Sequence, residues 1–265
     1  MVSINFYGDY HTHSRYSDGR QSVDAIVEAA VSRGLLEVAI TDHGPLAAVI
    51  GVKKPESYLA VKEKISRIQS RYPGIRILLG AEANIRDLSG TLDLEEDIIE
   101  ELDILIVGLH PYTWPGSIQD GWNLMVRNSL RHLGSKFRKE AVEANTKAII
   151  AALNRYPQID ILSHPGLFFK IHIEEVAWAC KIKQVLFEIN CAHKYPPISD
   201  IIEANRVGVK FIINSDAHFP ESVGNLDYGS WIVEKLGINR ERIANRRSGG
   251  GYKEWSKKTK DYAYS

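Results

Sequence analysis

The stretch ILIVGLHP, residues 104–111, carries the pattern on which the fold of this 265-residue chain depends. Four consecutive apolar residues lead into Gly108 and Leu109, and His110 and Pro111 follow at once. A short, continuous apolar run is typical of a parallel strand buried on both faces, because neither side of such a strand meets water. The pattern therefore places His110 at the carboxyl end of a buried strand.

The same pattern of a short apolar run recurs along the chain, mostly alternating with segments of helical periodicity. We expect strands at residues 4–10, 37–41, 76–83, 104–108, 159–163, 185–190 and 209–214. We expect helices at residues 22–33, 55–72, 94–101, 135–156, 173–183 and 198–206. Ser22 suits the N-cap of the first helix, and Gly34 suits the position just after its end. Seven strands separated mostly by helices predict an α/β fold of the TIM-like barrel type, with some distortion, rather than an open sheet.

Composition limits the class of protein. The chain is 44% hydrophobic and 25% charged, which suits one large soluble domain, and its 33 basic and 33 acidic residues cancel. A neutral chain gives no general reason to bind nucleic acid or an anionic membrane. No apolar run approaches the roughly 20 residues needed to span a bilayer. We expect no membrane partner.

The start of the chain and its cysteines indicate a compartment. The first residues, MVSINFYGDYHTH, lack the basic and apolar regions of a signal peptide. Cys180 and Cys191 are too few for a disulfide framework, and we expect buried, reduced thiols. These features predict a cytoplasmic protein. We assign residues 1–245 to the barrel and residues 246–265 to a flexible or loosely docked tail.

Polar residues of a few types follow the expected strands. Seven of the nine histidines lie there, and only His132 and His172 fall in expected helices or their approaches. In a parallel barrel the carboxyl ends of all strands open onto one face, where active sites assemble. His11 and His13 lie two apart, so their side chains point the same way on a strand and can bind one ion. Imidazole and carboxylate groups suit zinc, manganese or iron, and the pattern predicts a metal site. The imidazole and carboxylate groups near the ends of the expected strands include those of His11, His13, Asp18, His43, Glu82, His110, His164, Asp216 and His218.

Four ordered motifs resemble those of the PHP family, named for polymerase and histidinol phosphatase domains. They are DYHTHSRYSDG at residues 9–19, ITDHG at 40–44, HP at 110–111 and NSDAH at 214–218. The segments GAE, SHPG and FEIN match as well, so the resemblance covers roughly residues 5–245. It implies a distorted (β/α)7 barrel that holds up to three metal ions at the carboxyl ends of the strands.

The resemblance also implies how these residues divide among the ions. His11, His13, Glu82 and Asp216 would hold the first ion. Glu82 would bridge to a second ion, completed by His110 and His164. Asp18, His43 and His218 would hold the third ion, where some family members have histidine in place of Asp18. A water activated by the ions would lie near Glu82, Asp216 and His218.

The expected activity is hydrolysis of phosphate monoesters on small molecules, as in a histidinol phosphatase. Two or three divalent ions would activate the water, and zinc is favoured over manganese or iron. The chain lacks a phosphate-binding glycine loop, a dinucleotide fingerprint and a serine nucleophile elbow. A phosphodiesterase or 3′–5′ exonuclease is the main alternative, although the neutral charge does not favour a nucleic-acid partner. A metal-dependent amidohydrolase and a non-catalytic, metal-stabilised scaffold are the others.

Some residues have two interpretations that the sequence leaves open. Arg15, Lys170, His193 and Lys194 could contact the substrate phosphate or could be solvated surface groups. Asp9 and Asp42 stand beside candidate ligand histidines and could orient an imidazole or make a structural hydrogen bond at a strand end. The aromatic segment 112–132 could form a lid or substrate wall, or it could be a packed helix.

Overall fold

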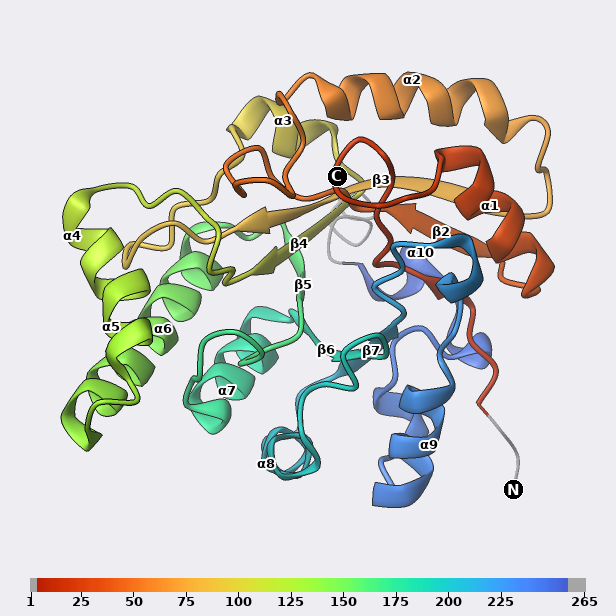
Figure 1. Cartoon of the computed structure of the whole chain (residues 1–265). Helices are drawn as coiled ribbons and strands as arrows, with labels where there is room; N and C mark the ends of the chain where they lie inside the picture. Colours follow the sequence, from red (N-terminus) through yellow and green to blue (C-terminus); the bar gives the residue numbers. More distant parts are fainter. Residues whose placement is uncertain (1–3, 257–265) are drawn as a thin grey trace, which may run out of the picture.

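Figure 1 shows the computed structural model, which describes residues 4–256, with strands at the centre and helices outside them. The strands are β1 (Gly8–Asp9), β2 (Glu37–Ile40), β3 (Arg76–Asn84), β4 (Ile104–Gly108), β5 (Ile159–Leu162), β6 (Leu186–Asn190) and β7 (Phe211–Asn214). Each strand pairs in parallel with the next one along the chain, so the sheet order runs from β1 to β7. The expected TIM-like barrel of seven strands is confirmed.

The first and last strands meet across an irregular seam, which distorts the barrel. Thr12 and Ala217 form a parallel bridge just beyond the carboxyl ends of β1 and β7. Nearer the amino ends, Asn245 lies between the two strands. Its side-chain amide donates to the carbonyls of Gly8 (3.0 Å) and Ile213 (2.6 Å). Asn245 thus takes hydrogen bonds that a direct ladder between β1 and β7 would use. The strand β1 spans only Gly8–Asp9 of the expected residues 4–10.

Helices follow most of the strands and cover the barrel (Figure 1). They are α1 (Val23–Ser32), α2 (Ser57–Gln69), α3 (Glu96–Glu101), α6 (Ser135–Arg155), α7 (Ile173–Lys183), α8 (Ile198–Val207) and α9 (Asp227–Leu236). All except α9 match expected helices to within a few residues. The Ser22 hydroxyl accepts from the Ala25 amide at the start of α1, and Gly34 follows its end with a φ of +70°. Among the described residues, no helix has the length and apolar character needed to cross a membrane.

The helix α9 was not expected, and its buried positions are Gly229, Ser230, Ile232 and Val233. A Cβ at Gly229 would lie 2.2 Å from the Ile213 side chain, so this helix packs very closely on β7. Close contact between backbone and sheet requires glycine there. The same glycine weakens the helical signal in the sequence.

The aromatic segment after β4 contains three short consecutive helices: α4 (Ile118–Asp120), the π-helical η1 (Gly121–Val126) and α5 (Arg127–Leu130). In Figure 1 they lie beside α6 at one side of the barrel. Leu124 is buried, and Asn128 and Asn145 exchange side-chain hydrogen bonds of 2.8 and 3.0 Å. This part of the segment is therefore a packed helix, one of the two interpretations that the sequence left open.

The side chains inside the barrel change from apolar to polar along its axis. An inner apolar layer near the amino ends contains Leu78, Ile104 and Leu186. Side chains alternate between the two faces of a strand, so along β3 the inward set continues from Leu78 to Glu82 and Asn84. Glu82 and Asn84 are fully buried. The strands thus place apolar side chains at one end of the barrel and polar side chains at the other.

The amino end of the barrel is covered by the last described helix, α10 (Tyr252–Trp255). Tyr252 is buried, and the ring of Trp255 meets the ring of Tyr10 edge to face at 5.0 Å. Glu37 Oε2 accepts hydrogen bonds from the Tyr10 hydroxyl (2.6 Å) and the Tyr252 amide (2.7 Å). This part of the expected tail packs against the barrel, whereas residues 257–265 lie outside the described residues.

Three short 3-10 turns connect the later elements. They are η2 (Pro220–Ser222), η3 (Arg240–Arg242) and η4 (Arg247–Gly249). The turn η2 belongs to the loop after β7, which also carries Asp216 and His218. It therefore lies at the carboxyl end of the barrel, whereas η3 and η4 precede the helix that covers the amino end.

Candidate metal centre

Glu82, on β3, lies at the centre of a buried cluster of histidines. Its two carboxylate oxygens face different groups of imidazoles. Oε1 lies near His164 Nε2 (2.9 Å) and His110 Nε2 (3.3 Å). Oε2 lies near His43 Nδ1 (3.0 Å), His11 Nε2 (3.2 Å) and His13 Nε2 (3.6 Å). One carboxylate therefore joins two sets of possible ligands.

Asp216 approaches the same histidines from the other side, in the loop after β7. Its Oδ1 lies 3.2 Å from His13 Nε2, 3.6 Å from His11 Nε2 and 3.7 Å from His218 Nδ1. The backbone of Asp216 has a φ of +55°, which is uncommon for a residue other than glycine. Such local strain is often found where a side chain is aimed into a functional site.

Asp18 forms the outer part of the cluster. Its Oδ2 lies 3.2 Å from His218 Nε2 and 3.8 Å from His43 Nε2, and its Oδ1 lies 3.8 Å from His13 Nδ1. The fold thus brings together all nine residues that the sequence suggested as ligands. Three groups have donor atoms within 4.8 Å of one another: His13, Asp18, His43 and His218; His11, His13 and Glu82; and His43, Glu82 and His110. In this geometry His13 and His43 each belong to two groups, so the division of ligands among ions stays a prediction.

Several buried atoms of the cluster have no hydrogen-bond partner in the described part of the chain. They are His11 Nε2, both ring nitrogens of His13, His43 Nδ1 and Glu82 Oε2. A buried polar atom left without a partner costs about 1–3 kcal/mol. Two donor atoms at about 2.1 Å from one tetrahedral ion are separated by about 3.4 Å, close to the separations observed here. The residues present therefore fit divalent cations.

The protonation states also suit a metal. Burial, together with the nearby His43, lowers the pKa of His13 to about 3. Burial lowers the pKa of His110 to about 4. Burial alone would raise the pKa of Glu82, but the surrounding histidines, His11 foremost, hold it well below its usual value. Burial alone would also lower the pKa values of His11, His43 and His164, but nearby carboxylates, Glu188 and Glu82 among them, raise these values. A cation bound there would displace those protons and take their place beside the ionised Glu82.

Glu188, on β6, supports the cluster and was not predicted. Its Oε1 accepts from His11 Nδ1 at 2.7 Å, which leaves His11 Nε2 facing Glu82. Its Oε2 accepts from the backbone amide of His164 at 2.8 Å. A carboxylate that binds the far nitrogen of a histidine fixes the ring and its tautomer. The signal was present in the sequence as a charged residue inside the apolar strand LFEIN.

Asn84 and Asp93 hold His110 in a similar way. Asn84 Oδ1 accepts from His110 Nδ1 at 2.7 Å, so His110 Nε2 faces His164 Nε2 at 3.4 Å. Asp93 in turn accepts from both the backbone amide (2.7 Å) and the side-chain amide (2.5 Å) of Asn84. A Cβ at Gly44, the residue after His43, would lie 2.2 Å from the Asp93 carboxylate. Asp93 therefore lies against residues that neighbour two candidate ligands: Asn84, which binds His110, and Gly44, which follows His43.

The carboxylates of Asp9 and Asp42 hold loops. Asp9 accepts from the amides of Ser215 (3.1 Å) and Gly224 (2.8 Å), in the loop that contains Asp216. Asp42 accepts from the amide of Ser14 at 2.7 Å and from the hydroxyl of Ser17 at 2.6 Å. The hydrogen bonds found for both carboxylates go to loop donors, and their role in orienting a ligand histidine stays a prediction. The structural hydrogen bond at a strand end is the role observed.

A cavity of about 470 Å³ opens onto the cluster. His193 lines it and places Nε2 3.5 Å from Asp216 Oδ2. Lys194 lines the adjoining cavity, and Lys170 donates to the Tyr195 hydroxyl at 2.7 Å. Arg15 is exposed and does not line the cavity. Of the four residues suggested as phosphate contacts, the structure brings only His193 to the cluster.

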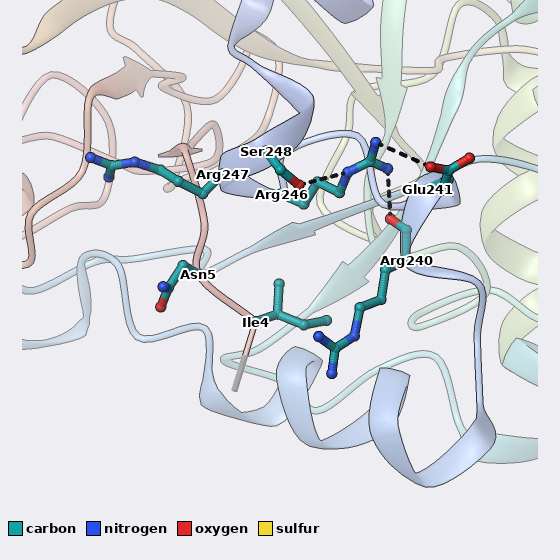
Figure 2. Close-up of a pocket in the computed structure, with 7 residues that line it drawn as sticks. All are labelled: Ile4, Asn5, Arg240, Glu241, Arg246, Arg247 and Ser248. Carbon is teal, nitrogen blue, oxygen red and sulfur yellow. Dashed lines mark hydrogen bonds and ion pairs between the residues drawn. The ribbon is translucent and has the colours of Figure 1, made fainter. Parts of the chain in front are cut away.

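A second cavity, of about 440 Å³, contains three arginines but does not form an anion site. Figure 2 shows that the side chains of Arg240, Arg246 and Arg247 point in different directions. Arg246 lies 3.9 Å from the carboxylate of Glu241, and Arg247 donates to the carbonyl of Gly34 at 2.7 Å. Their guanidinium groups do not converge on one point. The metal cluster is therefore the stronger candidate for binding a phosphate group.

Known proteins are similar in sequence to this chain over most of the barrel. A profile of the family described as PHP domain matches residues 9–215. A protein from Caldanaerobacter subterraneus subsp. tengcongensis, named probable phosphatase, is 31% identical over 94% of this chain and 96% of its own length. The DNA polymerase/3′-5′ exonuclease PolX of Bacillus subtilis is 26% identical over 91% of this chain but only 39% of its own length.

One solved structure with a similar fold comes from Lactococcus lactis subsp. lactis. It is a histidinol phosphate phosphatase in complex with zinc, L-histidinol and phosphate. Its TM-score against this chain is 0.60, with 18% identity over 88% of this chain and 94% of the other. At this level of identity the similarity concerns the fold alone.

Proposed function

The chain belongs to the PHP domain family, and from this premise we propose that it is a metal-dependent phosphoesterase that hydrolyses phosphate monoesters of small molecules. The observation that carries the proposal is the position of Glu82. Its two oxygens face separate sets of imidazoles, and buried ring nitrogens around it lack other partners. This arrangement suits a carboxylate that bridges two cations.

We assign the candidate ligands as the motifs suggest. One ion would be held by His11, His13, Glu82 and Asp216, a second by Glu82, His110 and His164, and a third by Asp18, His43 and His218. Zinc suits this mixture of imidazole and carboxylate best, with manganese or iron as alternatives. Ions bound there would lower the pKa of a water molecule and neutralise the charge of a phosphate.

The residues of the cluster set the charge of the site and fix the positions of its donor atoms. Glu82, Asp18 and Asp216 would repel a phosphate dianion by themselves, so substrate binding depends on cations at the cluster. Asp216 and His218 share one loop, and Asp9 holds that loop through Ser215. These contacts fix the donor atoms before substrate binds, which is the main contribution that a rigid site makes to catalysis.

His193 is our candidate for a direct contact with the substrate phosphate. It lines the cavity, its side chain is 44% exposed, and its backbone amide donates to Asn190 Oδ1 at 3.0 Å. That hydrogen bond holds the backbone at His193, and from this position the ring can donate a hydrogen bond to a phosphate oxygen at the cluster. Lys194 remains a second candidate from the adjoining cavity, and Arg15 and Lys170 are less well placed.

Histidinol phosphate is a reasonable candidate substrate, because a protein of similar fold is a histidinol phosphate phosphatase. A phosphodiesterase or exonuclease activity is the alternative, favoured by the similarity to PolX. Among residues 4–256, no lysine or arginine lines the cavity of the cluster, and a nucleic-acid backbone normally meets several of them. Small monoesters are therefore the preferred class.

A substrate panel tests this proposal. The zinc-loaded protein is incubated with small phosphate monoesters including histidinol phosphate, a dinucleotide diester, single-stranded DNA and simple amides. We expect fastest release of phosphate from the monoesters. His164→Ala should lower that rate by about 10³-fold or more, since it removes a ligand.

The matched control is His132→Ala, which removes an exposed histidine outside the cluster and should leave the rate unchanged. Faster cleavage of the diester or of DNA than of any monoester would favour the alternative activity. Amide cleavage without phosphate release would overturn the phosphoesterase assignment.

A further inference from the structure

The cavity that opens onto the cluster has an apolar wall beside the candidate ligands. Ile50, Tyr112, Phe168 and Phe219 form it. They come from four different loops, after β2, β4, β5 and β7. Side chains from separate loops that converge on one cavity form a shaped surface, as small-molecule sites commonly do.

Phe168 brings this wall into direct contact with the cluster. Its ring centroid lies 5.6 Å from those of His110 and His164, and it meets His164 nearly at right angles. Edge-to-face contacts of this kind hold a ring in a defined orientation. A group attached to a phosphate at the cluster would therefore contact Phe168.

Tyr112 and Phe219 stand at the mouth of the cavity with much of their surface exposed, 56% and 47%. The backbone of Tyr112 is fixed, since its carbonyl accepts from the Ala48 amide at 2.8 Å. The guanidinium of Arg20 lies 5.7 Å from the Phe219 ring. The backbone of Tyr112 and the ring of Phe219 each have a fixed neighbour, while the surface of both rings stays available to a ligand.

The charge of the cavity limits what else a substrate can carry. In the part of the chain that the structure describes, no lysine or arginine lines it. A substrate with a second anionic group or several hydroxyls would leave those groups against apolar side chains, which is unfavourable. A ring would instead bury apolar surface there.

The aromatic surface continues beyond this cavity. An adjoining cavity of about 680 Å³ shares Ala192 and Ser222 with it. Tyr228 and Trp231 line the second cavity, with ring centroids 5.8 Å apart. Lys194 and Asp227 are its charged residues. The space next to the cluster is therefore large enough for a ring together with a polar substituent.

From these observations we infer that the site selects phosphate monoesters whose alcohol carries an aromatic ring, which binds against Phe168, Tyr112 and Phe219. The inference rests on the proposed phosphoesterase function and adds the class of alcohol. Contacts with an aromatic ring in a hydrophobic pocket typically change specificity about 10-fold or more. The selectivity should appear mainly in kcat/KM.

The test compares phenethyl phosphate with glycerol phosphate, both esters of primary alcohols, so that the leaving groups have similar basicity. We expect the zinc-loaded protein to show a kcat/KM about 10-fold or more higher for the phenethyl ester. In the double variant Tyr112→Ala/Phe219→Ala the ratio should fall to about 2 or less, since little aromatic wall remains. Trp178→Ala is the matched control, because Trp178 is an exposed aromatic residue that lines neither cavity, and its ratio should equal that of the wild type.

A binding measurement accompanies the rates. Phenethylphosphonate, which cannot be hydrolysed, should compete at lower concentration than a hydroxyalkyl phosphonate of similar size, and the double variant should lose this difference. Equal kcat/KM for the two esters, together with equal competition, would overturn the inference and leave the proposed function standing. Absence of phosphate release from any ester by the zinc-loaded protein would overturn both.

Discussion

Buried carboxylates at the two ends of the barrel differ in their hydrogen-bond partners. At the amino end, the buried carboxylate of Glu37 accepts hydrogen bonds from Tyr10 and Tyr252, and Trp255 packs against both rings. At the carboxyl end, Glu82 is equally buried but one of its oxygens faces histidine nitrogens without a hydrogen bond.

This difference indicates that the amino end stabilises the fold and that the carboxyl end is suited to bind metal. A buried carboxylate with several donors is satisfied by the protein itself and helps to hold the fold together. A buried carboxylate whose oxygen faces imidazole nitrogens without a hydrogen bond is suited to an added cation. Substitutions at the amino end should therefore change stability, and substitutions at the carboxyl end should change metal binding and activity.

The largest effect is expected at the carboxyl end, from Glu82→Ala. Loss of the carboxylate that faces both sets of imidazoles should disrupt two ions at once and lower the rate of phosphate release by about 10⁴-fold or more. Zinc content per chain should fall as well, while the far-ultraviolet circular dichroism stays close to that of the wild type. Glu63→Ala, at an exposed glutamate, is the control. Near-normal activity in Glu82→Ala would contradict the bridging assignment.

The next largest effect is expected at the amino end, from Tyr252→Ala. Removal of this buried ring should lower the free energy of unfolding by about 3 kcal/mol, because it leaves a cavity under the barrel. Denaturant titration measures the change, and Leu133→Ala, at a residue 73% exposed, should change stability by about 0.5 kcal/mol or less. The specific activity of folded Tyr252→Ala should stay close to that of the wild type. A loss of activity comparable with that of Glu82→Ala would contradict the inference that the amino end affects stability alone.

A smaller effect should follow from Glu188→Gln. The amide keeps the size of the side chain but holds His11 Nδ1 less strongly, so zinc affinity should fall about 10- to 100-fold. Competition with a chelator measures the affinity, and excess zinc should restore part of the activity. Glu96→Gln, at an exposed position, should leave zinc affinity unchanged. Unchanged affinity in Glu188→Gln would show that His11 needs no such support.

The smallest effect concerns the metal-free protein and pH. Burial alone would lower the pKa of His218, but Asp18 raises it from 6.5 to about 9. The pair therefore stabilises the fold fully below about pH 6.5 and loses this contribution as pH rises through about 9. We expect a loss on the order of 1–2 kcal/mol over this range, reduced by partial exposure of both side chains.

Thermal unfolding of chelator-treated protein across this pH range measures the effect, and Asp18→Asn should flatten the dependence. Burial alone would also raise the pKa of Asp18, but His218 and neighbouring histidines lower it from 3.8 to about 2. Its contribution is present above about pH 3.8 and is lost as pH falls through about 2. A steeper loss in Asp18→Asn than in the wild type above pH 6.5 would contradict the pairing.

Much of the candidate site could be predicted because its residues occupy a recurring place in the sequence. His110, His164 and Asp216 each lie within two residues of the end of an apolar strand. In a parallel barrel that position alone brings a residue to one face, whatever the details of packing. The number of strands and most helices followed from periodicity in the same way.

The supporting residues could not be predicted in the same way. Glu188 and Asn84 bind His11 and His110, which are distant in sequence, and the pairing depends on the register of neighbouring strands. Asp9 and Asp42 stand close to ligand histidines along the chain, yet their side chains hold other loops. Asp42 is adjacent to His43, and adjacent side chains of a strand point to opposite faces, whereas Asp9 lies two residues before His11 and still binds the loop after β7. Proximity along the chain is therefore a poor guide to contact.

The sequence by itself determined the alternation of strands and helices, the seven-stranded barrel and the nine residues that meet at its carboxyl end, because these depend on local periodicity and on position along each strand. The tertiary structure alone decided which atoms of those residues face one another, how Asn245 opens the seam, and how Tyr252 closes the amino end. It also decided that an aromatic wall stands beside the cluster. These features arise from contacts between segments far apart in the chain, and no local pattern encodes the distances between them.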